Sequence, residues 1–184
     1  MTAVTREDQR RWDDRYTSKG PASVGAAKPP GVFAAYVDMF PTTGRALDIA
    51  CGQGFATVWL AQRGLQVLGL DVSAVAIGQA RELARQSGVA DRCRFDVVDL
   101  DDGLPDGPPV DVILCHKFRD RRLDRACIER LAPGGLLAMA TLSEVDAAPG
   151  PFRAVPGELA VAFAGLNLVT AGEGQGQAWL LARA

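Results

Sequence analysis

The chain has 184 residues, of which 48% are hydrophobic and 23% are charged, and its formal net charge is −2. This composition predicts a single globular domain, residues 1–184, whose core is large enough to fold without disulfides. The small negative charge gives no overall attraction to nucleic acid or to an anionic membrane, so neither is expected as a partner.

The first predicted element is an N-terminal helix, in which Trp12 and Tyr16 lie four residues apart and therefore on one face. Thr5 and Asp8 have the spacing of a capping box at its start. Residues 17–30 are rich in Gly, Pro, Ser and Ala and predict a hinge, so that residues 1–30 form a lid-like segment on a core of residues 31–184. Trp12 and Tyr16 either close over a bound molecule or only dock the helix on the core.

Strands and helices then alternate, which predicts parallel crossovers and a sheet covered by helices on both faces. Short apolar runs predict strands, and the stretches between them have helical spacing. The expected strands are 45–51, 65–71, 94–98, 110–115 and 136–142, and the expected helices are 55–63, 73–87 and 120–131. A helix at 158–165 and a terminal hairpin of 167–170 and 178–182, on either side of the stretch GEGQGQ, complete the chain.

The first strand ends in ALDIACGQG, residues 46–54. In an open parallel sheet, ligands bind at the carboxyl ends of the strands. Gly52 and Gly54 let a ligand approach the backbone there, and the helix that follows offers free N–H groups to an anionic part of it. Asp71, at the end of the second strand, lies where such folds place the acid that accepts hydrogen bonds from ribose. A ligand that contains a nucleoside is therefore predicted.

A nicotinamide oxidoreductase is disfavoured on three grounds. Thr57 stands where the dinucleotide fingerprint has its third glycine, and the acidic Asp48 precedes the glycines, where a pyrophosphate would be repelled. A Tyr-x-x-x-Lys or similar hydride-transfer pair is also missing from the sequence.

Several motifs together resemble those of a known family. LDIACGQG followed by GLDVS resembles motifs I and II of the class I S-adenosylmethionine (SAM)-dependent methyltransferases, and RFDVVDL, VDVILCH and LAPGGLLAMATL resemble their third, fourth and fifth strands. WDDRY and the small size are most similar to the tellurite-resistance and thiopurine type of small-molecule methyltransferase. The resemblance implies a Rossmann-like, doubly wound α/β sheet of seven strands in the order 3-2-1-4-5-7-6, with the last strand antiparallel. It also implies SAM as cofactor and S-adenosylhomocysteine (SAH) as its product.

The resemblance assigns roles to the first two strand ends. Asp48 and the loop backbone that follows it would hold the methionine part of SAM. Asp71 would bind the ribose, and Val72 would pack on the adenine. The N-terminal helix, through Trp12 and Tyr16, would cover the cofactor. The loop residues are Ala50, Cys51, Gly52, Gln53 and Gly54.

The third and fourth strand ends complete the implied site. Asp99 and Leu100 would border the adenine amino group, and Cys115 would line the cofactor floor. His116 lies beside the expected methyl position and is either a general base that titrates near neutrality or a residue that shapes the pocket. Methyl transfer otherwise requires mainly that nucleophile, methyl group and sulfur are aligned.

The acceptor is expected to be a small molecule, recognised by the N-terminal segment, His116 and residues 143–152. The sequence Cys-His-Lys-Phe at 115–118 differs from the Asn- or Asp-Pro-Pro-aromatic motif of the enzymes that methylate DNA bases. The basic run from Lys117 to Arg125 either attracts an anionic acceptor or is a solvated helix face paired with acids such as Asp120 and Asp124.

No metal is predicted, because the cysteines are scattered, His116 is the single histidine, and no acidic set of the catechol-methyltransferase kind is found. The cysteines are expected to be reduced. The charged N-terminus is unlike a signal peptide, and no run approaches the roughly 20 apolar residues of a membrane span, so a cytoplasmic protein is expected. It is expected to be a monomer or homodimer, and the alternative to an enzyme is a SAM-binding partner module that has lost catalysis.

Overall fold

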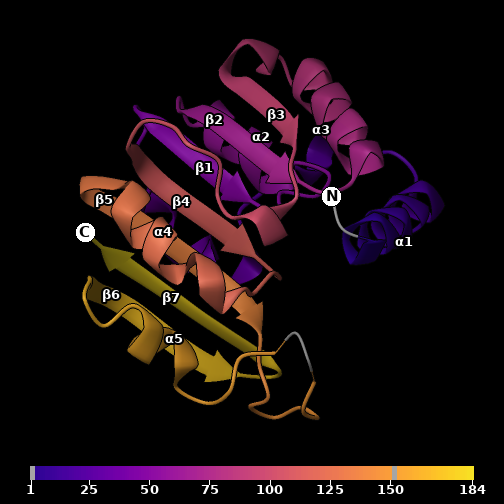
Figure 1. Ribbon diagram of the computed structural model, residues 1–184. Helices are drawn as coiled ribbons and strands as arrows, with labels where there is room; N and C mark the ends of the chain where they lie inside the picture. Colours follow the sequence, from indigo (N-terminus) through magenta and orange to yellow (C-terminus); the bar gives the residue numbers. More distant parts are fainter. Residues whose placement is uncertain (1–2, 151–152) are drawn as a thin grey trace.

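Seven strands form one sheet in the order β3-β2-β1-β4-β5-β7-β6, as expected (Figure 1). The computed structural model describes residues 3–150 and 153–184. Neighbouring strands from β3 to β5 are parallel, whereas β7 is antiparallel to both β5 and β6. The strands are β1 Arg45–Ile49, β2 Gln66–Asp71, β3 Cys93–Val97, β4 Val110–His116, β5 Leu131–Leu142, β6 Asn167–Gly174 and β7 Gln177–Arg183.

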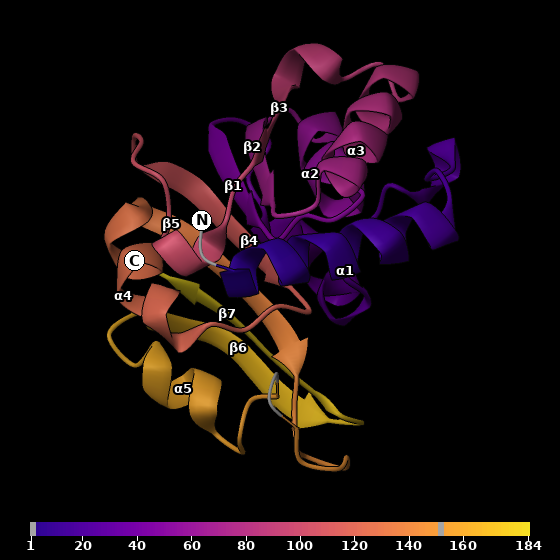
Figure 2. The ribbon, with the colours of Figure 1, turned by 45° about the vertical axis from the view of Figure 1, so that its right-hand side comes forward.

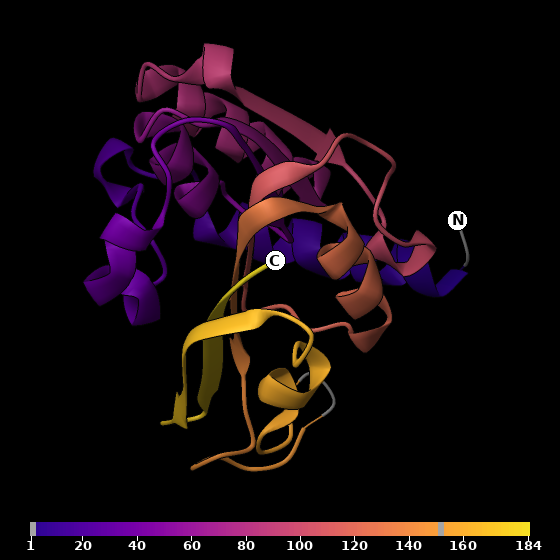
Figure 3. The ribbon, with the colours of Figure 1, turned by 90° about the vertical axis from the view of Figure 1, so that its left-hand side faces the viewer.

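Helices pack on both faces of this sheet, and Figure 3 shows the two layers on opposite sides of the strands. The α-helices are α1 Ala3–Lys19, α2 Phe55–Gln62, α3 Ala74–Gln86, α4 Asp124–Arg130 and α5 Glu158–Ala162. Short 3-10 helices are η1 Val24–Ala26, η2 Gly31–Met39, η3 Ala90–Arg92, η4 Leu100–Asp102 and η5 Arg121–Leu123.

The central strands are apolar on both faces because helices cover both. In β4, Ile113 and Cys115 face the cluster that includes α4 and α5, while Val112 and Leu114 face the cluster that includes α2 and η2. This is the pattern of a parallel sheet buried on both sides. On the α2 side, the helices also pack on one another, since α2 and α3 share a cluster with Phe95 of β3.

The hairpin at the end of the chain is longer than predicted. Its strands continue through most of the glycine-rich stretch and leave only Gln175 and Gly176 between them. Both have positive φ angles, 53° and 72°, which suits the tight two-residue turns of hairpins. The stretch is therefore mostly strand and not a flexible connection.

Three further expectations about the elements are wrong. The helix predicted over 120–131 is divided, because Asp120 caps a short 3-10 turn by accepting a hydrogen bond from the N–H of Arg122, and α4 begins only after it. β5 starts at Leu131, before the Pro-Gly-Gly turn signal, because Leu131 pairs with Val110 across an irregular register. α1 begins at Ala3, so Thr5 lies inside it and cannot be its cap.

Within the described ranges, no helix has both the length and the apolar composition needed to cross a bilayer.

One of the elements absent from the sequence prediction, η2, contributes Phe33 to the core, and Phe40 follows it directly. Phe33 is fully buried, and its ring centroid lies 6.2 Å from that of Phe40. Phe33→Ala is therefore expected to lower the free energy of unfolding by about 3–5 kcal/mol, because it leaves a cavity. Val24→Ala, at a residue that is 52% exposed, should change it by no more than about 0.5 kcal/mol. Urea denaturation of both variants measures this, and a Phe33→Ala loss as small as that of the control would contradict it.

Candidate cofactor site

The candidate residues lie at the carboxyl edge of the sheet, where β1 to β4 end. Helix α1 lies beside these strand ends in two views of the molecule (Figures 1 and 2). The ends of β1 to β4 therefore form one side of the candidate site, and α1, at the beginning of the chain, covers it.

The loop after β1 turns through left-handed backbone conformations at every second residue. Ala50, Gly52 and Gly54 have φ angles of 54°, 54° and 78°. For the two glycines this conformation costs little, whereas Ala50 adopts it with a side chain. Gly54 also allows close packing, because a Cβ there would lie 2.8 Å from the Cβ of Ala80 in α3. Backbone strain of this kind is often found at binding sites.

A buried hydrogen bond holds the base of this loop. The hydroxyl of Thr57, in α2, donates to Oδ2 of Asp48 at 2.6 Å, and both residues are buried. Burial raises the pKa of Asp48 to about 7, the bond from Thr57 opposes this rise, and the nearby charge of Asp71 adds to it. In the sequence, Thr57 stands out only as a departure from the dinucleotide motif. Its role could have been predicted from a hydroxyl group in a helix of otherwise mostly apolar residues that follows a buried acid.

Asp71 ends β2 and fixes the loop from the other side. Its two carboxylate oxygens accept hydrogen bonds from the backbone N–H groups of Gly52, at 2.8 Å, and Ser73, at 2.9 Å. Burial raises the pKa of Asp71, and these two bonds act in the opposite direction. A carboxylate has about four lone-pair positions, so Asp71 keeps capacity for the hydroxyls of a ribose.

The end of β3 supplies the clearest test of fit for an adenine. Oδ1 of Asp99 accepts a hydrogen bond from the N–H of Asp101 at 3.0 Å. Oδ2 of Asp99 is buried and has no hydrogen-bond partner among the described residues. A buried acceptor without a donor is costly, and an exocyclic amino group would satisfy it. Val72 follows Asp71 after the neighbouring strand β2 and is half-buried, and the side chain of Leu100 belongs to the core.

Helix α1 is docked on this edge by polar contacts. Asp13 accepts hydrogen bonds from the hydroxyl of Ser73, at 2.5 Å, and from the N–H of Val75, at 3.2 Å. The side chain of Gln53 donates to the carbonyl of Gly20 at 2.9 Å, just beyond the end of α1. Asp13 is part of the WDDRY motif, but the sequence gives no sign of its partners about 60 residues away.

The two aromatic residues of α1 lie over the glycine loop. The rings of Trp12 and Tyr16 stack with centroids 5.9 Å apart. A Cβ on Gly52 would lie 2.7 Å from the hydroxyl oxygen of Tyr16, so this hydroxyl occupies the space above Gly52. Burial and the charges of Asp71 and Cys51 raise the pKa of Tyr16. Its neutral hydroxyl is therefore available to donate a hydrogen bond.

Below the loop, Cys51 and Cys115 are thiols without a charge at neutral pH. Burial raises the pKa of each well above its usual value. The Sγ atom of Cys115 lies 3.4 Å from the carbonyl oxygen of Phe118 and belongs to the core. This position agrees with a floor residue and excludes a thiolate nucleophile.

His116 ends β4 beside β5, where it pairs with Ala140 in the register. Burial lowers its pKa to about 4, and the charge of Lys117 contributes to this. This direction argues against the expectation that His116 titrates near neutrality, because a half-buried imidazole next to an ammonium group resists protonation. Its ring makes no hydrogen bond to another described residue, so both nitrogens are available to a ligand.

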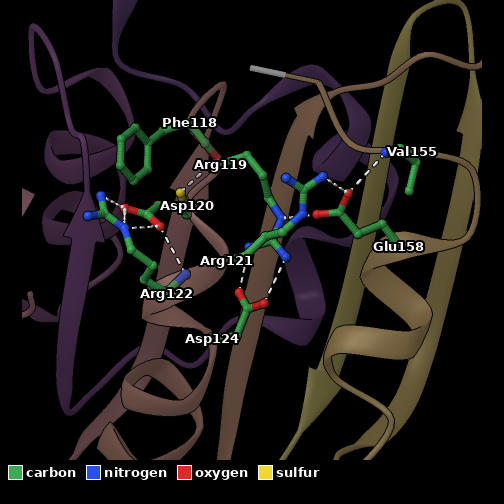
Figure 4. Close-up of polar contacts among 9 residues, drawn as sticks. Phe118, Arg119, Asp120, Arg121, Arg122, Asp124, Val155 and Glu158 are labelled. Atoms are coloured by element: carbon green, nitrogen blue, oxygen red, sulfur yellow. Dashed lines mark hydrogen bonds and ion pairs between the residues drawn. The ribbon is translucent and has the colours of Figure 1, made fainter. Parts of the chain in front are cut away.

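The arginines of the basic run are paired with acids, and Figure 4 shows Arg119, Arg121 and Arg122 with their partners. The buried guanidinium of Arg119 bonds Asp124, at 2.8 Å from Nη2, and Glu158, at 2.7 Å from Nε. The remaining pairs are Arg121 with Glu158, Arg122 with Asp101 and Asp120, and Arg125 with Glu129.

Arg119 and Glu158 thus join the loop after β4 to α5, next to the segment expected to contact the acceptor. Of that segment, 143–152, the last two residues lie outside the described ranges. In the part of the chain that the structure describes, no three side chains of His, Cys, Asp or Glu gather in a way that could hold a metal ion.

Comparison with known proteins shows that part of the chain is similar to methyltransferases. Residues 46–135 match the family described as "Methyltransferase domain". A ubiquinone biosynthesis O-methyltransferase of Chelativorans sp. is 36% identical over 112 residues, which cover 58% of this chain and 43% of that protein. A ribosomal RNA small subunit methyltransferase C of Alcanivorax borkumensis is 35% identical over 104 residues, covering 51% of this chain and 31% of that protein.

The structural likeness extends further along the chain than the sequence likeness. The crystal structure of TehB from Haemophilus influenzae has a TM-score of 0.74 at 18% identity and covers 94% of this chain and 66% of that one. At this identity the likeness concerns the fold. The chain spans less than half the length of the two curated relatives above. The resemblance found in the sequence is confirmed: residues 46–135 match a methyltransferase domain, and the fold is shared with a solved SAM-dependent methyltransferase.

Proposed function

We propose that this chain is a SAM-dependent methyltransferase that transfers a methyl group to a small molecule, and that residues 1–184 form one methyltransferase domain. The observation that carries the proposal is the set of acids at successive strand ends. Asp48 lies under the glycine loop, Asp71 beside it, and Asp99 has a buried oxygen without a donor. These positions suit the methionine, ribose and adenine parts of SAM, respectively.

The other implied roles follow from contacts in the structure. The hydroxyl of Tyr16 above Gly52 is placed to donate to the carboxylate of the methionine part. Trp12 stacks on Tyr16 and keeps its ring in place. Val72 would pack on the adenine, and Cys115 would form the floor. When bound, SAM supplies an electrophilic methyl group, and the protein's task is to align it with the acceptor and exclude water.

The acceptor class is the least constrained part of the proposal. The relatives include an O-methyltransferase of ubiquinone biosynthesis and an rRNA methyltransferase. We favour a small molecule, because the chain has a net charge of −2 and the arginines after β4 are bound to acids. Cytoplasmic location and a monomeric or homodimeric state stay predictions. SAM binding without turnover would instead favour the partner module.

Loss of Asp71 should weaken cofactor binding. Asp71→Ala removes an acceptor for ribose hydroxyls and frees the N–H of Gly52, so SAM affinity should fall by about 1–3 kcal/mol. Asp96→Ala removes an exposed acid from the neighbouring strand, where it pairs with Arg94, and serves as the control. Titration calorimetry with SAM and SAH measures both variants. Equal affinities of Asp71→Ala and wild type would remove Asp71 from the ribose role.

The raised pKa of Asp48 predicts a difference between SAM and SAH. SAM has a positive sulfonium, which favours the ionised form of a nearby carboxyl group, whereas SAH has none. Below the pKa of about 7, SAM binding must release the proton of Asp48, and above it no proton is released. SAM affinity relative to SAH should therefore increase between about pH 6 and pH 8. Asp48→Asn, which still accepts a hydrogen bond from Thr57, should remove the increase. The same pH dependence for both ligands would place the sulfonium elsewhere.

His116 should be neutral over the physiological pH range. Because it is the single histidine of the chain, its imidazole proton resonances in an NMR spectrum need no assignment. Their titration midpoint is expected near pH 4, below the usual value of about 6.5. Lys117→Gln should raise this midpoint, because the ammonium charge opposes protonation. A midpoint near 6.5 in the wild-type protein would show that the ring is solvated and distant from Lys117.

A further inference from the structure

The cations near the end of β4 fall into two groups. Arg119, Arg121, Arg122 and Arg125 are all bound to carboxylates. Lys117 follows His116 directly, is exposed, and forms no ion pair with any described residue. The arginines therefore hold the fold together, and the uncompensated charge of this run belongs to Lys117.

Lys117 is held in a strained conformation beside His116. Its φ angle is 61°, in the left-handed region, which is unfavourable for a residue with a side chain. Its N–H donates to the carbonyl of Ala140 in β5 at 2.8 Å, which anchors this conformation. Strained backbone conformations that the surrounding structure holds in place cluster at functional sites. The lowered pKa of His116 agrees with an ammonium charge close to the ring.

A second lysine approaches from α1. The Nζ atom of Lys19 lies 5.1 Å from the ring centroid of Tyr16, whose hydroxyl is above Gly52. Burial and the charges of Arg15 and Lys117 lower the pKa of Lys19. Lys19, like Lys117, has no carboxylate partner in the described ranges. The acid that acts on Tyr16, Asp71, is buried and bound to backbone N–H groups.

We propose that Lys117 and Lys19 together bind the negative charge of the methyl acceptor, so that the acceptor is a small molecule already ionised before it binds, such as a carboxylate or a thiolate. This proposal rests on the proposed function, and it names the substrate class of the same site. Lys117 and Lys19 both lie at the carboxyl edge of the sheet, one beside His116 and the other beside Tyr16, and like charges at one edge repel each other. A bound anion removes that cost.

An ionised acceptor also explains the state of His116. The electron pair of the acceptor's charged atom forms the new bond to the methyl carbon, and the old carbon–sulfur bond breaks with its electron pair on sulfur. The negative charge of the acceptor and the positive charge of the sulfonium disappear together, and the products are the methylated acceptor and SAH. No proton has to leave, so the neutral and weakly basic His116 can act as a contact to the acceptor without being a general base.

The test uses matched pairs of molecules that differ in charge but hardly in shape. SAH is first titrated into the protein, and the loaded protein is then titrated with acetate and acetamide, benzoate and benzamide, and phenylacetate and phenylacetamide. At least one carboxylate should bind tenfold or more tightly than its amide, because only the carboxylate can pair with the two ammonium groups. The resonances of His116 should move with the carboxylate, and their titration midpoint should rise because the anion favours protonation.

Variants separate this effect from a general loss of positive charge. Lys117→Gln and Lys19→Gln should each reduce the preference for the carboxylate, and the double variant should abolish it. Arg125→Gln removes the same charge from an exposed pair with Glu129 on α4 and should leave the preference intact. Turnover is then checked as SAH formed from SAM with the preferred carboxylate and with the corresponding thiolate.

Each outcome has one meaning. If SAH does not bind, the proposed function fails, and this inference fails with it. If SAH binds but no pair favours the carboxylate, or the preference survives in the double lysine variant, the inference is overturned and the methyltransferase proposal stands. A preference lost equally in Arg125→Gln would show that it arises from overall charge and would also overturn the inference.

Discussion

The carboxyl group of Asp48 is buried at the end of β1, and the arrangement of the carboxyl edge depends on how it is satisfied. Its bond from Thr57 joins β1 to α2 beneath the loop of residues 50–54. On the β2 side of the loop, Asp71 accepts a hydrogen bond from the N–H of Gly52. With both ends fixed, the loop keeps its left-handed turns, and the hydroxyl of Tyr16 lies above Gly52. The cost of burying Asp48 is visible in its raised pKa.

The sequence predicted well those features that depend on local patterns of residues. Apolar runs between turn signals located every strand of the sheet, and the glycine pair with Asp71 located its functional edge. The family motifs supplied the strand order, because order is a property of the whole chain. Boundaries failed where a distant partner decides them: Leu131 joins β5 because Val110 lies opposite, and Phe33 is buried because η2 folds back on α2 and the sheet.

Two of the roles that could not be predicted depend on partners far along the chain. Asp13 bonds Ser73 and Val75, and Arg119 bonds Glu158. In the sequence, Lys117 and Arg119 are equivalent members of one basic run. In the folded chain Lys117 is exposed and has no acidic partner among the described residues. The guanidinium of Arg119 is buried between two carboxylates. Whether a charge is available to a ligand is thus a property of the tertiary structure.

The docking of α1 affects how a cofactor would enter and leave the site. Tyr16 covers Gly52, and Asp13 fastens the helix to the start of α3. If a nucleoside binds beneath them as proposed, lifting of the helix breaks the bonds of Asp13 and opens a route for its release. A local opening of the first helix would then limit the rate of cofactor exchange, so that a spent cofactor occupies the site after the chemical step is complete.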